Sequence, residues 1–423
     1  MKVLLLGSGG REHALALKIR ESASCTALFI APGNPGTAQC GINVSLDFND
    51  RSQLHSFLDR ENIDLIVAGP EQPLVDGLAD DLRAMGALDH RVFFGPGASG
   101  ARLEGSKRFA KAFMMRHQIP TAAYASFNRS EAQAAADYLK KMRAPYVIKA
   151  DGLAAGKGVI STRSLPEAQE VLKELFDGSL GEAGETVVLE EFLDGVEFSV
   201  FVMTNGEALI WLPEAKDYKR IGEGDTGPNT GGMGSLSPVP FVNQELMQKV
   251  DVRIVQPTLK GLQEEGIPYL GFIFFGLILV NGEPYVIEYN ARMGDPETQS
   301  VMPRVQGDFV EAMWNLGKGL PCQALPIDSM ASASVVLVAE GYPGAYEKGK
   351  EIEVAALNGV HLLHAGTAEK DGKLITNGGR VMAINAKAHS VNDCLRMIYS
   401  QTDQVDFEGK RFRRDIGKDV GAL

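Results

Sequence analysis

The chain has 423 residues, 44% of them hydrophobic and 23% charged, which predicts a globular protein of two to four domains. Its formal net charge of −12 argues against a nucleic-acid-binding protein, because sequence-independent binding to phosphate backbones needs a basic surface. The four cysteines form no C-x-x-C pair, and the longest apolar run, Gly271–Val280, is about half of a membrane span. We therefore expect a cytoplasmic protein with reduced thiols, without a zinc site and without a membrane anchor.

The first hundred residues alternate strands and helices. Apolar runs predict strands at Lys2–Leu6, Ala27–Ile30, Asp64–Ala68 and Arg91–Phe94, and a helix from about Arg11 to Glu21. Each strand ends in a loop rich in glycine and proline that leads into a helix. This pattern predicts a parallel, doubly wound α/β sheet with its ligand site at the carboxyl ends of the strands.

The first glycine loop, GSGGRE at Gly7–Glu12, does not match a dinucleotide-binding fingerprint. The pattern G-x-G-x-x-G/A would need a small residue where Glu12 stands, and the expected acidic residue after the second strand is replaced by Ala31 and Pro32. The backbone amides at the helix start, with Arg11, favour a single phosphate ester instead. The alternative is a glycine turn that only packs.

The rest of the chain predicts mainly short strands, paired antiparallel because the turns between them are short. Strands are expected at Tyr146–Ala150, Val159–Thr162, Thr186–Glu191, Glu197–Thr204, Ala208–Leu212, Gly271–Val280, Glu283–Tyr289, Ala333–Ala339, Val360–Ala365 and Arg380–Asn385. Helices are expected near Leu165–Leu175, Gln244–Glu264 and Val391–Ser400, and a linker at Pro321–Pro326. The segment Asp217–Gly234 has too many glycines and too few apolar residues for a regular element, so we expect a long functional loop there.

The stretch DGLAAGKGV, Asp151–Val159, has the glycines and the lysine of a P-loop but not its spacing. Gly158 stands where a Ser or Thr would bind magnesium, and the β-branched residues that follow favour a strand over a helix. The loop is therefore expected to be a glycine-rich flap between two strands, which offers backbone N–H groups and Lys157 to an anion. Lys149 on the preceding apolar strand also needs an anion, unless its side chain faces solvent.

Two further stretches suggest a nucleotide and a metal ion. The turn EEFL, residues 190–193, could offer backbone groups to the edge of an adenine ring, although pairs of acidic residues are usually only exposed to solvent. In VIEYNARMGDPE, Glu288 and Asn290 are two residues apart on one strand, so both oxygens face the same side, which suits magnesium. Arg292 would follow on that side and could clamp a phosphoryl group. The alternative, an exposed strand face, fits the apolar YVIEYN poorly.

Taken together, these motifs resemble the glycinamide ribonucleotide synthetase family of the ATP-grasp superfamily. The resemblance rests on GSGGREH, PGNPG, GSK, IKADGLAAGKGV, EEFLDGVE, DYKR, GPNTGGMG and EYNARMGDPETQ, and it covers essentially the whole chain. It implies a purine-biosynthetic ligase in which the glycine carboxylate attacks ATP to give glycyl phosphate, and the amine of 5-phosphoribosylamine then displaces phosphate. Such chemistry needs alignment and charge neutralisation more than acid–base groups, in agreement with the absence of a Ser/His/Asp pattern.

The resemblance also implies roles for individual residues toward ATP and Mg²⁺ or Mn²⁺. The ATP phosphates would be bound by Lys107 and Lys149 and covered by a flap of Gly156, Lys157 and Gly158. Adenine would lie against Glu190, Glu191, Phe192 and Leu193, and the ribose against Glu197. The metal would be held by Glu288 and Asn290. Arg292, Lys219 and Asp295 would act on the transferring phosphoryl group.

The two other substrates would lie next to these groups. Glycine and the acyl phosphate would be surrounded by Asp217, Gly231, Gly232 and Met233. Phosphoribosylamine would be held by Gly9, Gly10, Arg11, Glu12, Asn34, Gly36, Pro70 and Glu71. The expected fold is α/β and α+β with several domains. These are an N-terminal doubly wound parallel sheet (1–103), a central ATP-grasp domain (104–325) with a mobile lid subdomain at about 122–190, and a small C-terminal α+β domain (326–423). We expect a monomer whose partners are small molecules.

Two departures from the family pattern concern the metal site and packing. Many ATP-grasp enzymes carry a further acidic metal ligand on the strand before Glu288, and GFIFFGLILV has none, although this family itself uses a Glu-x-Asn pair. Met293 replaces an expected aromatic residue, which concerns packing more than chemistry. Three alternatives stay open: another carboxylate-activating ATP-grasp ligase of purine metabolism, a nucleotide-responsive binding protein without chemistry, and, more distantly, an NAD-dependent dehydrogenase.

Overall fold

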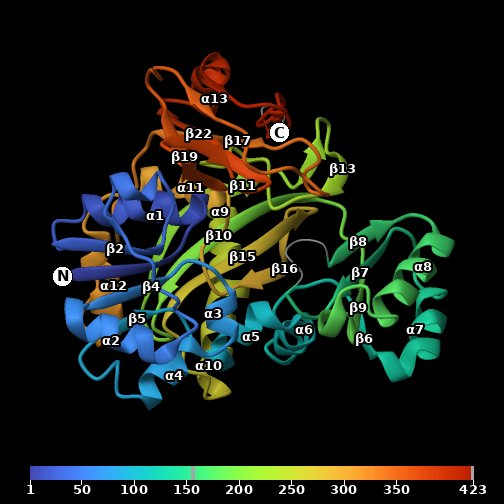
Figure 1. Cartoon of the computed structure of the whole chain (residues 1–423). Helices are drawn as coiled ribbons and strands as arrows, with labels where there is room; N and C mark the ends of the chain where they lie inside the picture. Colours follow the sequence, from blue (N-terminus) through green and yellow to red (C-terminus); the bar gives the residue numbers. More distant parts are fainter. Residues whose placement is uncertain (154–157, 421–423) are drawn as a thin grey trace.

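The N-terminal segment forms a five-stranded parallel sheet in the computed structural model, which describes residues 1–153 and 158–420 (Figure 1). The strand order is β3-β2-β1-β4-β5. The strands are β1 (Lys2–Gly7), β2 (Ala27–Pro32), β3 (Ile42–Asn43), β4 (Leu65–Ala68) and β5 (Val92–Phe94), and the helices are α1 (Gly10–Glu21), α2 (Arg51–Glu61), α3 (Gln72–Val75), α4 (Leu78–Ala84) and α5 (Ala98–Gly105). The doubly wound sheet predicted from the sequence is confirmed.

Alternate side chains of β1 pack on opposite faces of this sheet. Val3 and Leu5 pack with α1 and with α12 (Phe309–Lys318), a helix from much later in the chain. Leu4 and Leu6 pack on the other face, with α2 and α4. Because both faces are buried, the strands read as continuous apolar runs. The carboxyl ends of the strands remain free to line a site.

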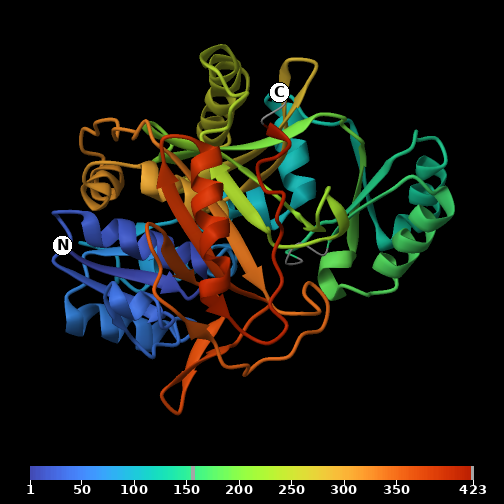
Figure 2. The same ribbon diagram turned by 90° about the horizontal axis from the view of Figure 1, so that it is seen from above.

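A four-stranded antiparallel sheet stands apart from this first sheet, with the rest of the molecule between them (Figures 1 and 2). Its order is β6-β9-β7-β8, with β6 (Tyr124–Asn128), β7 (Tyr146–Ala150), β8 (Val159–Thr162) and β9 (Thr186–Glu191). The helices α7 (Ala132–Leu139) and α8 (Leu165–Phe176) cover it and form a small core of their own. The predicted flap residues Gly156 and Lys157 lie outside the described residues.

An eight-stranded sheet joins the centre of the chain to its C-terminal segment. Its order is β16-β15-β10-β11-β14-β17-β22-β19, and every neighbouring pair is antiparallel. The strands are β10 (Val196–Thr204), β11 (Leu209–Asp217), β14 (Gly234–Ser237), β15 (Gly271–Val280), β16 (Glu283–Asn290), β17 (Ala331–Val338), β19 (His361–His364) and β22 (Arg380–Ala388). The C-terminal strands therefore extend the central sheet through the pairing of β14 with β17.

The remaining elements surround these sheets. They are α6 (Lys107–Arg116), α9 (Gln244–Val250), α10 (Gln256–Glu264), α11 (Glu297–Val301), α13 (Val391–Gln401) and the short pairs β12 (Arg220–Gly222) with β13 (Thr226–Asn229), β18 (Glu353–Val354) with β23 (Val405–Asp406), and β20 (Thr367–Lys370) with β21 (Lys373–Thr376). No helix in the described ranges has the length and apolar character needed to cross a membrane.

The predicted helix Gln244–Glu264 is interrupted by a π-helical turn at Asp251–Val255. The interruption lies just before Pro257, which has no N–H to donate and whose ring crowds the preceding turn. A wider i→i+5 turn accommodates such a residue without ending the helix. The chain therefore continues in the same direction as α10.

The segment Asp217–Gly234 is not the structureless loop that the sequence predicts. It contains the hairpin β12–β13, in which Ile221 packs against a small apolar cluster and charged groups bond to the C-terminal tail. Arg413 Nη1 lies 2.6 Å from Asp225 Oδ1, and the backbone N–H of Gly224 donates to Asp415 Oδ2 at 2.7 Å. Apolar periodicity cannot predict such a hairpin, because its partners are charged residues nearly 200 positions away.

Two buried histidines connect the N-terminal and C-terminal segments. The backbone N–H of His364, in β19, donates to Nδ1 of His13, in α1, at 2.8 Å. Asn34 Nδ2 donates to the carbonyl oxygen of His364 at 3.0 Å. Burial lowers the pKa of both imidazoles, to about 3 for His13, where His364 adds to the effect, and to about 4 for His364. Both rings are therefore neutral in the folded protein at neutral pH.

These two histidines make the fold sensitive to mild acid. In the unfolded chain a histidine binds a proton below about pH 6.5, but the folded protein binds it only near pH 3–4. Each group therefore stabilises the fold above pH 6.5, and this contribution is lost as the pH falls, by up to about 1.4 kcal/mol per pH unit. His364→Gln should make the free energy of unfolding fall less steeply between pH 6.5 and 5 in urea titrations. The exposed His389→Gln should keep the wild-type slope, and an equal slope in His364→Gln would contradict the assignment.

Candidate active site

A cavity of about 980 Å³ lies where the N-terminal segment, α6, the four-stranded sheet and the eight-stranded sheet meet. The C-terminal segment adds Tyr342, Arg380 and Asp419 to its wall. The predicted site residues that line the cavity are Arg11, Glu71, Lys107, Lys149, Gly158, Glu190, Glu191, Phe192, Leu193, Glu197, Asp217, Lys219, Gly231, Glu288, Asn290, Arg292 and Asp295. Residues that are spread over nearly 300 positions of the sequence, from Arg11 to Asp295, thus line one cavity.

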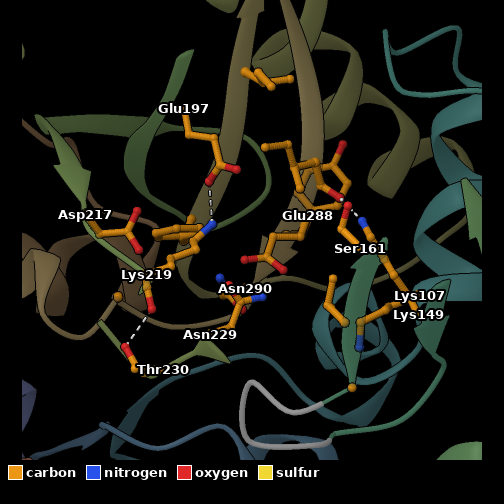
Figure 3. Close-up of a pocket in the computed structure, with 18 of the residues that line it drawn as sticks. Lys107, Lys149, Ser161, Glu197, Asp217, Lys219, Asn229, Thr230, Glu288 and Asn290 are labelled. Atoms are coloured by element: carbon orange, nitrogen blue, oxygen red, sulfur yellow. Dashed lines mark hydrogen bonds and ion pairs between the residues drawn. The ribbon is translucent and has the colours of Figure 1, made fainter. Parts of the chain in front are cut away.

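Two lysines form one wall of the cavity (Figure 3). Lys107 lies in the first turn of α6, and its Nζ donates to the carbonyl oxygen of Gly152 at 3.3 Å. Lys149 lies on β7, and its Nζ is 2.9 Å from Glu190 Oε1. Burial lowers the pKa of Lys107. A negatively charged group bound here would favour the charged form of Lys107.

Asp151, at the base of the glycine-rich loop, caps α6. Its Oδ1 accepts from the backbone N–H of Arg108 at 2.7 Å, and its carboxylate also accepts from the hydroxyl of Ser106. Its carbonyl oxygen accepts from the backbone N–H of Lys107 at 3.2 Å. A carboxylate at a helix N-terminus is stabilised by the unpaired amides and by the helix dipole. This contact fixes Lys107 relative to the loop that begins at Asp151.

Glu190, at the end of β9, is held between two lysines. Its Oε1 faces Lys149, and its Oε2 lies 2.9 Å from Nζ of Lys111, which is one helical turn after Lys107 on α6. Burial raises the pKa of Glu190, but the Lys149 and Lys111 ammonium groups outweigh it, and the net shift is downward. The sequence analysis missed Lys111, although its spacing of four from Lys107 places it on the same helix face.

Glu288 and Asn290 point into the centre of the cavity from β16 (Figure 3). They pair with Gly276 and Phe274 of β15, and the register shifts by one residue just beyond Gly276. Neither side chain has a hydrogen-bond or ion-pair partner among the residues that the structure describes. No cluster of three or more His, Cys, Asp or Glu side chains suited to a metal occurs within the same residues. The pair could therefore supply two oxygen ligands, and other ligands would have to come from water or a bound molecule.

A second group of charges lies opposite the lysine wall. Lys219 Nζ is 2.7 Å from Glu197 Oε2, and Asp217 lies beside them (Figure 3). Burial lowers the pKa of Lys219, but the carboxylates of Glu197, Asp217 and Glu288 raise it well above its ordinary value. Burial and the Asp217 charge raise the pKa of Glu297, at the start of α11, to about 8. The sequence analysis missed Glu297, which ends the GDPE motif.

Arg292 lies between two carboxylates at the edge facing the N-terminal sheet. Its Nη2 is 2.7 Å from Glu104 Oε1, and its Nε is 3.2 Å from Glu71 Oε2. Arg11 Nη1 is 3.7 Å from the same oxygen of Glu71. Burial raises the pKa of Glu71, but Arg292 and Arg11 lower it to about 2 overall. This network joins the first glycine loop to the strand that carries Glu288.

Asp295 and the loop at Gly231 are held by Arg380 from the C-terminal segment. Arg380 Nη2 is 3.1 Å from Asp295 Oδ2, and its Nη1 donates to the carbonyl oxygen of Gly231 at 2.6 Å. The hydroxyl of Tyr342 accepts from the backbone N–H of Gly231 at 2.8 Å. A Cβ atom at Gly232 would come within 2.3 Å of Pro296, so only glycine permits this close approach. Arg380 and Tyr342 were missed because nothing local in their sequence marks them.

Several predicted residues support the cavity without lining it. These are Gly9, Gly10, Glu12, Asn34, Gly36, Pro70, Gly232 and Met233. The Glu12 carboxylate accepts from the backbone N–H of Gly9 at 2.5 Å and from Arg11 Nε at 2.6 Å. The Asn34 side chain bonds to backbone groups through both its oxygen and its nitrogen. Met233 is buried in a small apolar cluster. A ligand could still reach these loops through their backbone amides.

The sequence matches three family models in order along the chain. Residues 1–104 match the N domain of phosphoribosylglycinamide synthetase, residues 105–298 its ATP-grasp (A) domain, and residues 332–419 its C domain. The phosphoribosylamine–glycine ligase of Agrobacterium fabrum is 46% identical over 421 residues, which cover 99% of this chain and 98% of that protein.

Solved structures give the same result. The chain is similar to the crystal structure of phosphoribosylamine–glycine ligase from Thermotoga maritima, with a TM-score of 0.86 and 38% identity, over 98% of this chain and 100% of that one. It is also similar to the biotin carboxylase domain of 2-oxoglutarate carboxylase from Hydrogenobacter thermophilus, with a TM-score of 0.73 over 98% and 92% of the two chains. At 15% identity the second likeness concerns the fold alone.

The cap that Asp151 provides can be tested by its contribution to stability. Asp151→Ala removes the acceptor for the Arg108 N–H and should lower the free energy of unfolding by about 1 kcal/mol, measured by urea denaturation. Asp151→Asn is the matched control, because an amide oxygen can still accept this hydrogen bond, and it should lose less than half as much. Equal losses in the two variants would show that the hydrogen bond is not what stabilises α6.

Proposed function

The chain belongs to the phosphoribosylglycinamide synthetase family, and we propose that its 980 Å³ cavity is where the family's reaction takes place. The protein is an ATP-dependent ligase of purine biosynthesis that joins glycine to 5-phosphoribosylamine. One observation carries the assignment to this cavity: lysines, arginines and two oxygen ligands without a partner in the described residues line it together. Phosphoryl transfer requires this combination of positive charge and metal ligands.

The donor atoms of Glu288 and Asn290 fit a divalent metal ion. Both side chains point into the cavity, neither is engaged by a described cation, and Mg²⁺ prefers oxygen ligands completed by water and phosphate. ATP-grasp ligases use ATP and a divalent metal, and we propose Mg²⁺ or Mn²⁺ at this pair. When bound, the ion would supply positive charge to the β- and γ-phosphate oxygens.

In the first step, a carboxylate oxygen of glycine attacks the γ-phosphorus of ATP. The bond from that phosphorus to the bridging oxygen breaks, its electron pair leaves with ADP, and glycyl phosphate forms. Lys107 and Lys149 would neutralise the phosphate chain, and Arg292 would hold the moving phosphoryl group. Lys219 and Asp217 lie opposite, where they would orient the glycine carboxylate and ammonium groups (Figure 3).

In the second step, the amine nitrogen of phosphoribosylamine attacks the acyl carbon of glycyl phosphate. The bond from carbon to the phosphate oxygen breaks, phosphate leaves, and the nitrogen loses a proton as the amide forms. Arg11 and Glu71 lie at the end of the cavity that faces the N-terminal sheet, and we assign the phosphoribosylamine site to this end. An acyl phosphate must be kept from water, and a cavity walled by several segments limits its contact with solvent.

The reaction can be tested by measuring phosphate release while each substrate is omitted in turn. With ATP, glycine and phosphoribosylamine all present, phosphate should be released in amounts equal to the amide product. Omission of either glycine or phosphoribosylamine should stop sustained release, because the acyl phosphate then cannot form or cannot react. ATP turnover that is indifferent to glycine would overturn the proposed function and would favour another carboxylate substrate.

The metal assignment predicts the effect of Glu288→Gln. Loss of a charged metal ligand should lower kcat by about a hundredfold or more, because several kcal/mol of transition-state stabilisation is lost. The fold should be unchanged by circular dichroism. Glu283→Gln is a matched control at the outer end of the same strand, where Glu283 pairs with Lys249, and it should keep its kcat. Wild-type turnover in Glu288→Gln would remove the metal from this position.

A further inference from the structure

Lys111 is a buried charge that the reaction steps above do not use. Its side chain is 2% exposed, and it lies on α6, a helix that contacts both β9 of the four-stranded sheet and β16 of the eight-stranded sheet. Its Nζ lies 2.9 Å from Glu190 Oε2 and donates to the hydroxyl of Thr121 at 2.7 Å. A lysine is rarely so deeply buried unless its charge is paired.

Glu190 is shared between this lysine and Lys149. The two ammonium groups contact different oxygens of the carboxylate, each at 2.9 Å, and all three side chains are at most 5% exposed. Two positive charges therefore share one negative charge. Within the described part of the chain, Oε1, the oxygen nearest Lys149, has no hydrogen bond of good alignment. Lys149 can therefore give up its contact with Glu190 and contact another anion instead.

Binding of a nucleotide creates competition for Lys149. The phosphate chain attracts this ammonium group, but if Lys149 were the sole partner of Glu190, its departure would leave a buried carboxylate without a counter-charge. Such an unpaired buried charge is strongly unfavourable. The cost would appear as weaker binding of the nucleotide. A second cation that stays on Glu190 removes this cost.

We propose that Lys111 is a positioning residue that keeps Glu190 paired and thereby allows Lys149 to move to the nucleotide phosphates. The proposal rests on the function assigned above, in which Lys149 binds ATP. Lys111 suits this part because it is anchored on its far side: the Thr121 hydroxyl that accepts from it donates in turn to the carbonyl oxygen of Val286 at 2.7 Å. The second contact of Lys149, from its Nζ to the carbonyl oxygen of Ile287, is longer at 3.4 Å, so Lys111 stays with Glu190 while Lys149 moves.

The test is Lys111→Met, which keeps the length of the side chain and removes its charge. The dissociation constant of ATP, measured by calorimetry with Mg²⁺ and without turnover, should rise at least about tenfold. The KM for ATP should rise in parallel, whereas kcat and the KM values for glycine and phosphoribosylamine should stay within about twofold. A residue that only stabilised the fold would not affect ATP selectively. Unchanged ATP affinity, or an equal loss for all three substrates, would overturn the proposal.

A double variant tests whether Lys111 acts through Glu190. In a Glu190→Gln background the charge that Lys111 balances is absent, so adding Lys111→Met should change ATP affinity by less than about twofold. A further tenfold loss would overturn the proposal. This comparison also covers the case in which Lys111→Met alone does not fold, because the double variant removes both members of the Lys111–Glu190 ion pair instead of one.

Lys140→Met is the matched control on the surface of the four-stranded-sheet region. Lys140 pairs with Asp137 in an exposed ion pair, so this variant should bind ATP and turn over as wild type does. Failure of the proposed function and failure of this inference are distinguishable. The first would appear in the wild-type protein as phosphate release that does not depend on glycine, and the second only in the Lys111 variants.

Discussion

The dominant constraint on this molecule is that the positive charges needed for a triphosphate must be buried before the triphosphate arrives. A buried cation without a partner is strongly unfavourable, and several cations of the cavity are paired with a carboxylate of the protein, whereas Lys107 donates to the carbonyl oxygen of Gly152. The pairs are Lys149 with Glu190, Lys219 with Glu197, Arg292 with Glu71 and Glu104, and Arg380 with Asp295. In the function proposed above, binding of substrates would be an exchange of partners, in which carboxylates of the protein give way to phosphates and to the carboxylate of glycine. The carboxylates so released need partners of their own, and this requirement explains why acidic and basic residues are interleaved around the cavity.

Much of this arrangement could be predicted from the sequence where a local pattern determines it. Continuous apolar runs predicted the parallel sheet, and the two-residue period of a strand predicted that Glu288 and Asn290 would face the same side. The resemblance of the motifs to a known family added the reaction. The partners of the charged residues could not be predicted in this way. Lys111 looks like any lysine on an amphipathic helix, and Arg380 lies in a strand whose local sequence carries no motif. The place of both in the site depends on contacts with residues more than 75 positions away in the sequence.

The continuity of the eight-stranded sheet explains how distant segments can hold one site accurately. Because β14 pairs with both β11 and β17, Asp217 at the end of β11 and Arg380 at the start of β22 belong to a single hydrogen-bonded framework. A domain boundary placed between the central and C-terminal segments of the sequence therefore falls within one continuous sheet. Side chains on such a framework are placed more accurately than side chains on separate bodies joined by loops. Tyr342 and Arg380 can for this reason fix the loop at Gly231.

The ion pairs that hold the hairpin β12–β13 also determine when this part of the protein can become fixed during synthesis of the chain. Asp225 and its partner Arg413 are 188 residues apart. At a synthesis rate of about 5–20 residues per second, the hairpin waits roughly 10–40 s on the ribosome for the segment that anchors it. In the later part of that interval the strand that carries Glu288 and Asn290 has already been made, but the hairpin β12–β13 is not yet anchored. In the function proposed above, a partly made chain would therefore carry the metal-binding pair before the part of the wall that contains Lys219 and Asp217 is fixed.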